Sequence, residues 1–371
     1  MPILTAVKKK SAQFNFAVLG VVIFLACIGF AMLYSAGNGP EPWMMKQLIR
    51  FLIGLVIIYA VAMTSLEFWM RTAYGIYVVS LILLIAVEIM GHVGGLGAQR
   101  WIDLYVIKIQ PSELMKIAMI LVLARFFHYS QLQEKGQISS LLIPLTLVAV
   151  PTVLVMLQPD LGTAVMLLLS SASIIFLAGI RTWKVWAVIC SAAASMPIIW
   201  MFLHDYQKER VLTFLEPERD PLGSGYNIIQ SKIALGSGGL FGKGFMNGSQ
   251  GQLDFLPEKQ TDFIFSIFCE EFGFVGAMVL LLAYALIIGY GYLVAFQCRS
   301  GFGRYLSIGM TTLIFLYAFI NTAMVTGLVP VVGKPLPLIS YGGTSLLTFM
   351  FGLGLLFCVD VHRDDHLGRA R

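Results

Sequence analysis

The stretch that decides the fold is IFSIFCEEFGFVGAMVLLLAYALIIGYGYLVAF (residues 264–296), in which Glu270 and Glu271 are the only charged residues. A helix of about 20 mostly apolar residues crosses the hydrocarbon core of a bilayer. This run therefore predicts a membrane span. Because it is too long for one straight span, we expect part of it to form an interfacial lead-in.

The same pattern repeats along the chain. Of 371 residues, 58% are apolar and 12% charged, with mean hydropathy +0.83, whereas soluble domains average about 25% charged residues. Such a chain cannot coat soluble domains with charge, and it is too apolar to be disordered. We predict one all-α polytopic membrane domain over residues 1–371. Its ten expected transmembrane helices are 14–36, 46–65, 72–91, 111–129, 138–157, 161–180, 183–204, 264–296, 303–326 and 342–361, with a long extracytoplasmic loop at 205–261.

The basic residues predict the orientation. Lysines and arginines gather before the first span (Lys8–Lys10), after the last span (Arg363) and in alternate loops. Positive charge favours the cytoplasmic side, so we expect a multi-pass membrane protein with both termini inside. The net charge of +5 then reflects topology, and no nucleic acid partner is expected. The acidic residues fall mostly on the outer side, which holds most of the candidate chemistry.

Three carboxylates precede the eighth span at a spacing of four. They are Asp254, Glu258 and Asp262, and a helical segment would place them on one face. Carboxylates gathered this way suit general-base chemistry. A second interpretation is that Thr261 or Asp262 caps a helix that begins at Phe263. The two roles are compatible.

A short outer turn, QPDLGT (158–163), places Asp160 at the membrane edge. Proline before it and glycine after it are typical of a turn followed by a capped helix. In an outward cavity, the same carboxylate would bind a cation or hold a lysine from a loop.

A second polar cluster spans GAQRWIDL (97–104) and QPSELMK (110–116). Lys116 lies one turn inside a predicted span, where a lysine is costly unless it is paired or faces a wet cavity. One interpretation pairs it with Glu113. The other gives Arg100, Lys108 and Lys116 the task of holding an anionic head group such as a phosphate.

Two segments rich in glycine or proline remain. GSGGLFGKG (236–244) fails the phosphate-loop pattern, since Ser237 and Gly244 stand where Gly and Ser or Thr are required. We therefore predict a flexible loop or a tight turn, and no nucleotide cofactor. The segment from Pro330 to Gly343 predicts a re-entrant or outer-surface loop packed under the long loop. Glu88, Glu270 and Glu271 are acidic residues in or near spans, and such residues are functional candidates.

Five motifs together resemble the SEDS family: GAQRWIDL, QPSELMK, QPDLGT, LPEKQTDFIF (256–265) and PLPLISYGG (335–343). Their order, the spans and the long loop also match. DYQKERV (205–211), DPLGSGY (220–226) and QSKIA (230–234) are similar to the rod-shape branch rather than the division branch. One departure is Gln260, where the family often has histidine, so no role of that histidine is carried over.

This resemblance implies a peptidoglycan glycosyltransferase that polymerises lipid II outside the cytoplasm onto an undecaprenyl-linked glycan. Its expected partners are a class B penicillin-binding protein, which crosslinks the glycan, and other proteins of the elongation machinery. By motif position, Asp262 matches the family's essential aspartate. Seven further residues match polar positions of its outward cavity: Arg100, Lys108, Glu113, Lys116, Asp160, Asp254 and Glu258.

The implied chemistry needs one base. Asp262 would remove a proton from the acceptor's sugar hydroxyl, which then displaces the pyrophosphate with inversion. Nearby cationic side chains, or a divalent cation such as Mg²⁺ or Mn²⁺, would neutralise the leaving group. Two other classes stay open on the sequence alone: a flippase for lipid-linked precursors, and a scaffold without activity of its own.

Overall fold

The computed structural model is almost entirely helical. It describes residues 14–90, 92–93, 99–103, 108–130, 139–158, 160–179, 200–201, 205–219, 224–253, 255–256 and 258–368. The long helices are α2 (Phe16–Gly37), α3 (Trp43–Met63), α4 (Leu66–Met90), α5 (Pro111–Tyr129), α7 (Ser139–Leu157), α8 (Leu161–Leu177), α13 (Ile264–Gln297), α14 (Gly301–Thr326) and α15 (Gly343–Val361).

These nine helices lie at nine of the ten predicted spans. Six of them are long and apolar enough to cross a membrane (α2, α3, α4, α13, α14 and α15), and α7 and α8 contain shorter apolar stretches. The predicted span at 183–204 lies almost entirely outside the described residues. The chain is therefore an all-α polytopic membrane protein.

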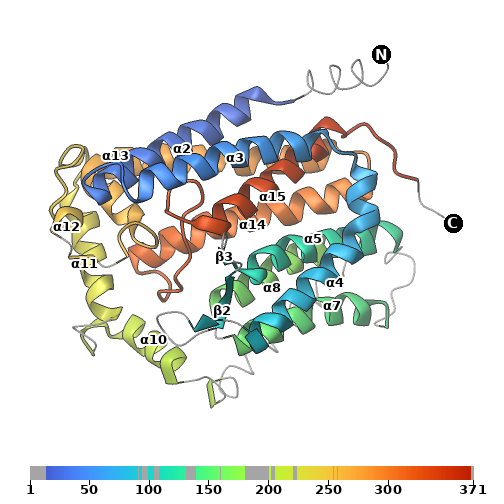
Figure 1. The fold of residues 1–371 in the computed structure, drawn as a ribbon, viewed down its shortest axis with the longest axis horizontal. Helices are drawn as coiled ribbons and strands as arrows, with labels where there is room; N and C mark the ends of the chain where they lie inside the picture. The colour runs from blue at the N-terminus through green and yellow to red at the C-terminus, as the bar shows by residue number, and fades with distance from the viewer. Residues whose placement is uncertain are drawn as a thin grey trace.

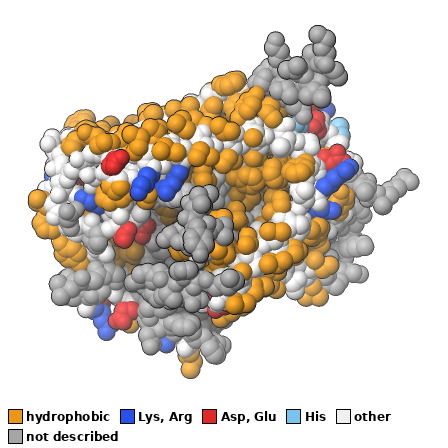
Figure 2. All heavy atoms as spheres, in the orientation of Figure 1, with side chains coloured by type: hydrophobic (Ala, Val, Ile, Leu, Met, Phe, Trp, Pro, Cys, Tyr) orange, Lys and Arg blue, Asp and Glu red, His pale blue; other side chains and the backbone are white. Residues whose placement is uncertain are grey.

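The bundle is layered around α14 and α15. α14 packs against α5, α8, α13 and α15, and 78% of the most apolar part of α14 and of α15 is buried, against 28% for α3. Figure 2 shows hydrophobic side chains over the long helices, with charged side chains mostly toward the two ends. Outer helices that expose apolar surface are expected when lipid replaces water as the solvent.

The two ends of the bundle differ. The start of α2 and the end of α15 lie at one end, on the right in Figure 1, and the elements of the long loop lie at the other. Those elements are α10 (Asp205–Leu215), the 3₁₀ helix η1 (Pro217–Arg219), α11 (Ser224–Ser237) and α12 (Ser249–Gln252). The described parts of the long loop are thus ordered, as its apolar stretches predicted. A small antiparallel sheet joins β1 (His92–Val93), β2 (Gln99–Asp103) and β3 (Lys108–Ile109) between α4 and α5.

The long apolar run at residues 264–296 forms α13, and it bends at Gly273. Gly273 has φ 67° and ψ −166°, which splits α13 into a short first part and a long second part. All side chains from Ile264 to Glu271 are buried. The separate lead-in is therefore confirmed, but it lies inside the protein and is not a helix on the membrane surface.

The glycine-rich segment 236–244, hereafter the glycine-rich loop, supplies hydrogen bonds in place of those that the bend at Gly273 breaks. The amides of Phe274 and Val275 donate to loop carbonyls, at 2.9 and 3.0 Å. In return, the carbonyls of Glu270 and Glu271 accept from the amides of Lys243 and Gly244, both at 3.0 Å. The predicted tight turn is confirmed, and its glycines let loop and helix backbones touch: a Cβ on Gly273 would lie 2.3 Å from a loop nitrogen.

Candidate active site

Asp262 lies in a turn directly before α13, and its side chain is partly exposed. The amides of Thr261 and Asp262 both donate to the Glu258 carbonyl, at 3.0 and 3.2 Å. The N-cap of α13 is Phe263, with no side chain capping it, so the capping prediction is wrong because the turn occupies those two residues. Glu258 has φ 54°, so a regular helix that would align it with Asp254 does not form.

The segment between α14 and α15, residues 327–342 and hereafter the return segment, packs under this turn. The Tyr341 amide donates to the Gln260 carbonyl (2.8 Å), and the Ser340 hydroxyl donates to the Thr261 carbonyl (2.5 Å). The return segment also passes the carboxylate itself, since a Cβ on Gly333 would lie 3.3 Å from Asp262 Oδ2. The predicted packing of this segment under the long loop is confirmed.

Behind the return segment lies a buried ion pair. Lys334 Nζ is 3.0 Å from Asp160 Oδ2 and also donates to the Thr163 hydroxyl. Asp160 caps α8 at the same time, because its Oδ1 accepts from the Thr163 amide at 3.1 Å. Both predicted roles of Asp160, helix cap and holder of a loop lysine, are therefore present together.

A second buried pair lies next to the first. Lys116 Nζ is 2.7 Å from Glu113 Oε1, so the pair predicted from their spacing is present. Tyr317 on α14 completes it: its hydroxyl donates to Glu113 Oε2 at 2.5 Å and accepts from Lys116, whose ammonium also lies 4.3 Å from the ring centroid. Lys334 interacts electrostatically with both members of this pair. We call Glu113, Lys116, Asp160 and Lys334 the charge cluster.

An arginine lies at the edge of the return segment. The Arg50 guanidinium stacks over the Tyr341 ring at 5.1 Å, and it lies near Gly343, the first residue of α15. Its Nη1 is buried and has no hydrogen-bond partner among the described residues. An arginine placed this way near a helix start is suited to an anion.

Glu270 and Glu271 serve the architecture. Glu270 is fully buried, and its carboxylate accepts from Lys243 Nζ (2.6 Å), the Ser249 hydroxyl (3.0 Å) and the Gln250 amide (3.1 Å). Glu271 accepts from Ser35 on α2. The Glu270 contacts hold the end of the glycine-rich loop and the segment that follows it against the bend in α13, and the Glu271 contact joins α13 to α2. Glu88, the third acidic candidate, is exposed near the end of α4.

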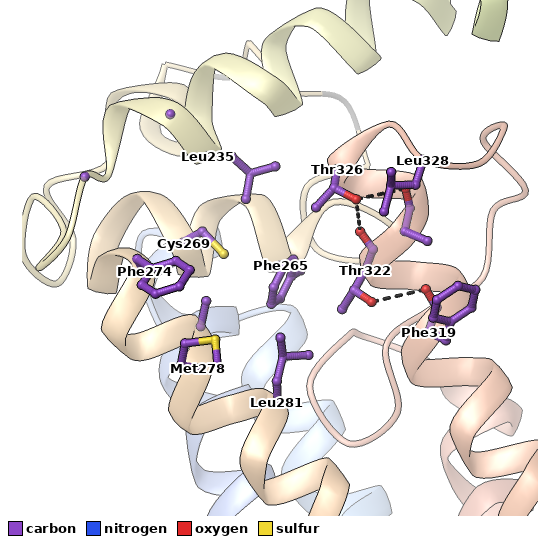
Figure 3. A pocket seen from close by; sticks show the side chains of 14 residues that line it. Leu235, Phe265, Cys269, Phe274, Met278, Leu281, Phe319, Thr322, Thr326 and Leu328 are labelled. Atoms are coloured by element: carbon purple, nitrogen blue, oxygen red, sulfur yellow. Dashed lines mark hydrogen bonds between the residues drawn. The ribbon is translucent and has the colours of Figure 1, made fainter.

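An apolar pocket of about 420 Å³ lies between α11, both parts of α13, and α14 (Figure 3). Phe265 and Leu281 line it from α13, and Phe319 lines it from α14. The hydroxyls of Thr322 and Thr326 bond to carbonyls of their own helix, so they offer little to a ligand. This pocket is suited to apolar groups only.

The side chains of three predicted site residues lie outside the part of the chain that the structure describes. Asp254 lies outside the described residues, and Arg100 and Lys108 are described only as backbone in β2 and β3.

No three His, Cys, Asp or Glu side chains within the described ranges form a group that could hold a metal ion. Glu258 is exposed, and its carboxylate accepts from the Thr261 hydroxyl at 3.2 Å.

Sequence reasoning missed four residues of this region: Arg50, Tyr317, Asn321 and Lys334. Lys334 lies in the segment from Pro330 to Gly343, for which the sequence predicts only a loop, and Tyr317 and Asn321 lie inside an apolar run. Their partners come from distant segments of the chain, so spacing gave no signal.

These observations define a class: a polytopic membrane protein with a polar site in which a partly exposed carboxylate lies over a buried charge cluster. The chain belongs to the FtsW/RodA/SpoVE family of cell cycle proteins, whose model matches residues 10–365.

Three relatives illustrate the match. The peptidoglycan glycosyltransferase MrdB of Escherichia coli K12 is 43% identical over 350 residues, covering 92% of this chain and 93% of that protein. The MrdB of Helicobacter pylori is 37% identical over 90% of this chain and 87% of that protein. A probable peptidoglycan glycosyltransferase FtsW of Trichlorobacter lovleyi is 36% identical over 94% and 93%.

Solved structures agree with this assignment. A chain from a peptidoglycan synthase complex that coordinates polymerization and crosslinking has a TM-score of 0.82 at 32% identity, covering 94% of this chain and 98% of that one. The rod shape determining protein RodA of Thermus thermophilus has a TM-score of 0.73 at 27% identity, with 95% and 98% covered.

Proposed function

We propose that this chain is a peptidoglycan glycosyltransferase that polymerises lipid II into glycan strands during cell elongation, with Asp262 as the general base. One observation carries the proposal. The partly exposed carboxylate of Asp262 lies against Gly333 of the return segment, and the residue after Gly333, Lys334, belongs to the buried charge cluster. The names of the relatives, peptidoglycan glycosyltransferases MrdB and FtsW, support the same activity.

The chemistry follows from the residue types. Asp262 accepts the proton of the acceptor's sugar hydroxyl as that oxygen attacks the anomeric carbon of the donor, and the undecaprenyl pyrophosphate leaves with inversion. The leaving group carries its own negative charge, so it needs neutralisation rather than a proton. One carboxylate base therefore suffices.

The described geometry favours Arg50 as one source of that neutralisation. The two lysines of the charge cluster already pair with Glu113 and Asp160, whereas Arg50 Nη1 has no hydrogen-bond partner among the described residues. Arg100 and Lys108 stay predictions as further ligands, since the structure describes only their backbone. Lys116, Glu113 and Asp160 then act mainly by fixing the floor of the site.

A divalent cation is not required by this scheme. Among the described residues, Asp262 and Glu258 are the only carboxylates at the turn, and no metal-holding group of three is present there. Mg²⁺ or Mn²⁺ stays a prediction from the sequence, and we derive no step through it.

The proposed partner is a class B penicillin-binding protein, together with other elongation proteins. The synthase complex that this fold matches, which coordinates polymerization and crosslinking, supports such a pairing. We further propose that the protein lies in the bacterial inner membrane, with both termini in the cytoplasm and the site outside. The start of α2 and the end of α15 lie at the end of the bundle opposite the elements of the long loop, which supports this orientation.

The test is polymerisation of purified lipid II by the protein in complex with a partner whose transpeptidase site is inactivated. Wild type is expected to make glycan strands, Asp262→Asn to lose at least about 100-fold in rate, and Asp365→Asn, an exposed aspartate at the opposite end, to retain full rate. The partner alone serves as the blank. Equal rates in wild type and Asp262→Asn would remove the base from Asp262. Transport of lipid II across vesicles without glycan product would favour the flippase, and partner binding with neither activity would favour the scaffold.

A further inference from the structure

One buried amide joins the Asp262 turn to the return segment. Asn321 lies on α14 and is fully buried. Its Nδ2 donates to the backbone carbonyl of Asp262 at 3.0 Å and to that of Lys334 at 2.7 Å. Both neighbours are carbonyls, which only accept hydrogen bonds, so the donor end of the amide has to face them.

Three elements of the proposed site therefore converge on this side chain. The Asp262 turn carries the proposed base, and Lys334 links the return segment to Asp160 at the start of α8. α14 contributes Asn321 itself. The base and the charge cluster come from distant parts of the sequence, and Asn321 is bonded to the backbone of both.

The two bonded carbonyls belong to irregular backbone. Asp262 precedes the first residue of α13, and Lys334 lies between α14 and α15, so neither carbonyl belongs to a helix ladder. The Asn321 side chain also carries a cost, because its Oδ1 is buried without a partner among the described residues. An unsatisfied buried acceptor lowers stability, and the two donated hydrogen bonds offset that cost.

We infer that Asn321 is a positioning residue for the reaction: its amide fixes the Asp262 turn against the return segment and so holds the carboxylate at reacting distance. The inference rests on the proposed function. Misplacing a catalytic group by about 1 Å costs on the order of 100-fold in rate. Because the amide is neutral and donates to the backbone carbonyl of Asp262, its loss is expected to move the base without changing its charge.

The test compares Asn321→Leu, which removes both donors at similar size, with a matched control. Ser231→Ala is that control: its hydroxyl is buried, bonds to the Val325 carbonyl and lies 2.8 Å from the Ser266 hydroxyl, so it joins α11, α13 and α14 one helical turn from Asn321. In the lipid II assay, Asn321→Leu is expected to lower kcat about 100-fold with KM within about threefold. Ser231→Ala is expected to keep both within about threefold.

A second readout follows the turn directly. Hydrogen exchange of the amides in residues 258–263 is expected to be faster in Asn321→Leu and unchanged in Ser231→Ala. Asn321→Ser keeps one donor and is expected to give an intermediate kcat, and it replaces Asn321→Leu if that variant does not fold.

The outcomes separate the inference from the proposed function. Inactive wild type would overturn the proposed function. Active wild type with unchanged kcat in both Asn321 variants would overturn the inference alone. The inference also fails if KM rises while kcat holds, or if Ser231→Ala loses as much kcat as Asn321→Leu, because the effect would then be general loosening of the helices.

Discussion

Asp262 and Glu270 stand close together in sequence at the start of α13, yet the protein uses them in opposite ways. Glu270 is fully buried and accepts from a lysine of the glycine-rich loop and from a serine and a backbone amide that follow it. Asp262 is partly exposed, and its backbone is held from two directions, by the Glu258 carbonyl and by Asn321. The Glu270 carboxylate thus stabilises the fold, whereas the Asp262 carboxylate is positioned through its backbone.

Two carboxylates near the start of α13 therefore have separate proposed roles, one in catalysis and one in stability. A carboxylate that accepts several donors in a buried site loses them when it takes a proton, so it is poorly suited to acid–base work. A carboxylate fixed through its backbone leaves its oxygens to face a substrate. Substitution of Glu270 should therefore change stability more than rate, and substitution of Asp262 should change rate more than stability.

The largest expected effect is at the bend. Gly273→Ala would place a Cβ 2.3 Å from the Gly242 amide nitrogen and 2.6 Å from the Leu240 carbonyl oxygen, at φ 67°. Backbone strain and overpacking together should lower the free energy of unfolding by about 4 kcal/mol. Gly289→Ala is the matched control, since a Cβ there meets nothing within 4 Å. Thermal unfolding in detergent measures both, and equal melting temperatures would show that the bend does not depend on this close approach.

A slightly smaller loss is expected on the Asp262 side, in the charge cluster. Lys334→Met leaves Asp160 buried without its cation, and removing one partner of a buried ion pair costs about 3 kcal/mol. The Asp160 cap of α8 uses a different oxygen and should persist. Adding Asp160→Asn to Lys334→Met should recover part of the stability, which a double-mutant cycle of unfolding free energies measures. A cycle with no coupling would contradict the pairing.

Glu270→Gln tests the architectural carboxylate with the same chemical change as Asp262→Asn. It should lower the free energy of unfolding by about 2 kcal/mol, a reduced value because the Lys243 side chain is 31% exposed. Asp262→Asn, at a partly exposed site, should change stability by less than about 0.5 kcal/mol. Glu270→Gln should thus lower the melting temperature more than Asp262→Asn does. Asp262→Asn should lower the rate of glycan synthesis by the folded fraction more than Glu270→Gln does. An inactive but fully stable Glu270→Gln protein would break the comparison.

The sequence predicted these regions unequally, for physical reasons. Hydropathy alone located the helices, because a bilayer demands about 20 apolar residues in a row, and the span 111–129 matches α5 residue for residue. Spacing within one turn also gave the Glu113–Lys116 pair. The partners of Asp160 and Asp262 were not predictable: Lys334 and Asn321 come from distant segments, and only helix packing brings them there. The wrong prediction, a cap at Asp262, followed from assuming a regular helix start where Glu258 turns the chain into a left-handed conformation.

The smallest expected effect sharpens the role of Glu258 itself. Its φ of 54° is a conformation that asparagine tolerates better than other non-glycine residues. Glu258→Asn should therefore raise the free energy of unfolding by about 0.5 kcal/mol, while Glu258→Ala should not. If the carboxylate also contacts substrate, as the motif predicts, Glu258→Asn should lose about fivefold in rate, the equivalent of ~1 kcal/mol for one hydrogen bond. A more stable variant with unchanged rate would assign Glu258 to shaping the turn alone, because an exposed side chain that binds substrate cannot be shortened without cost.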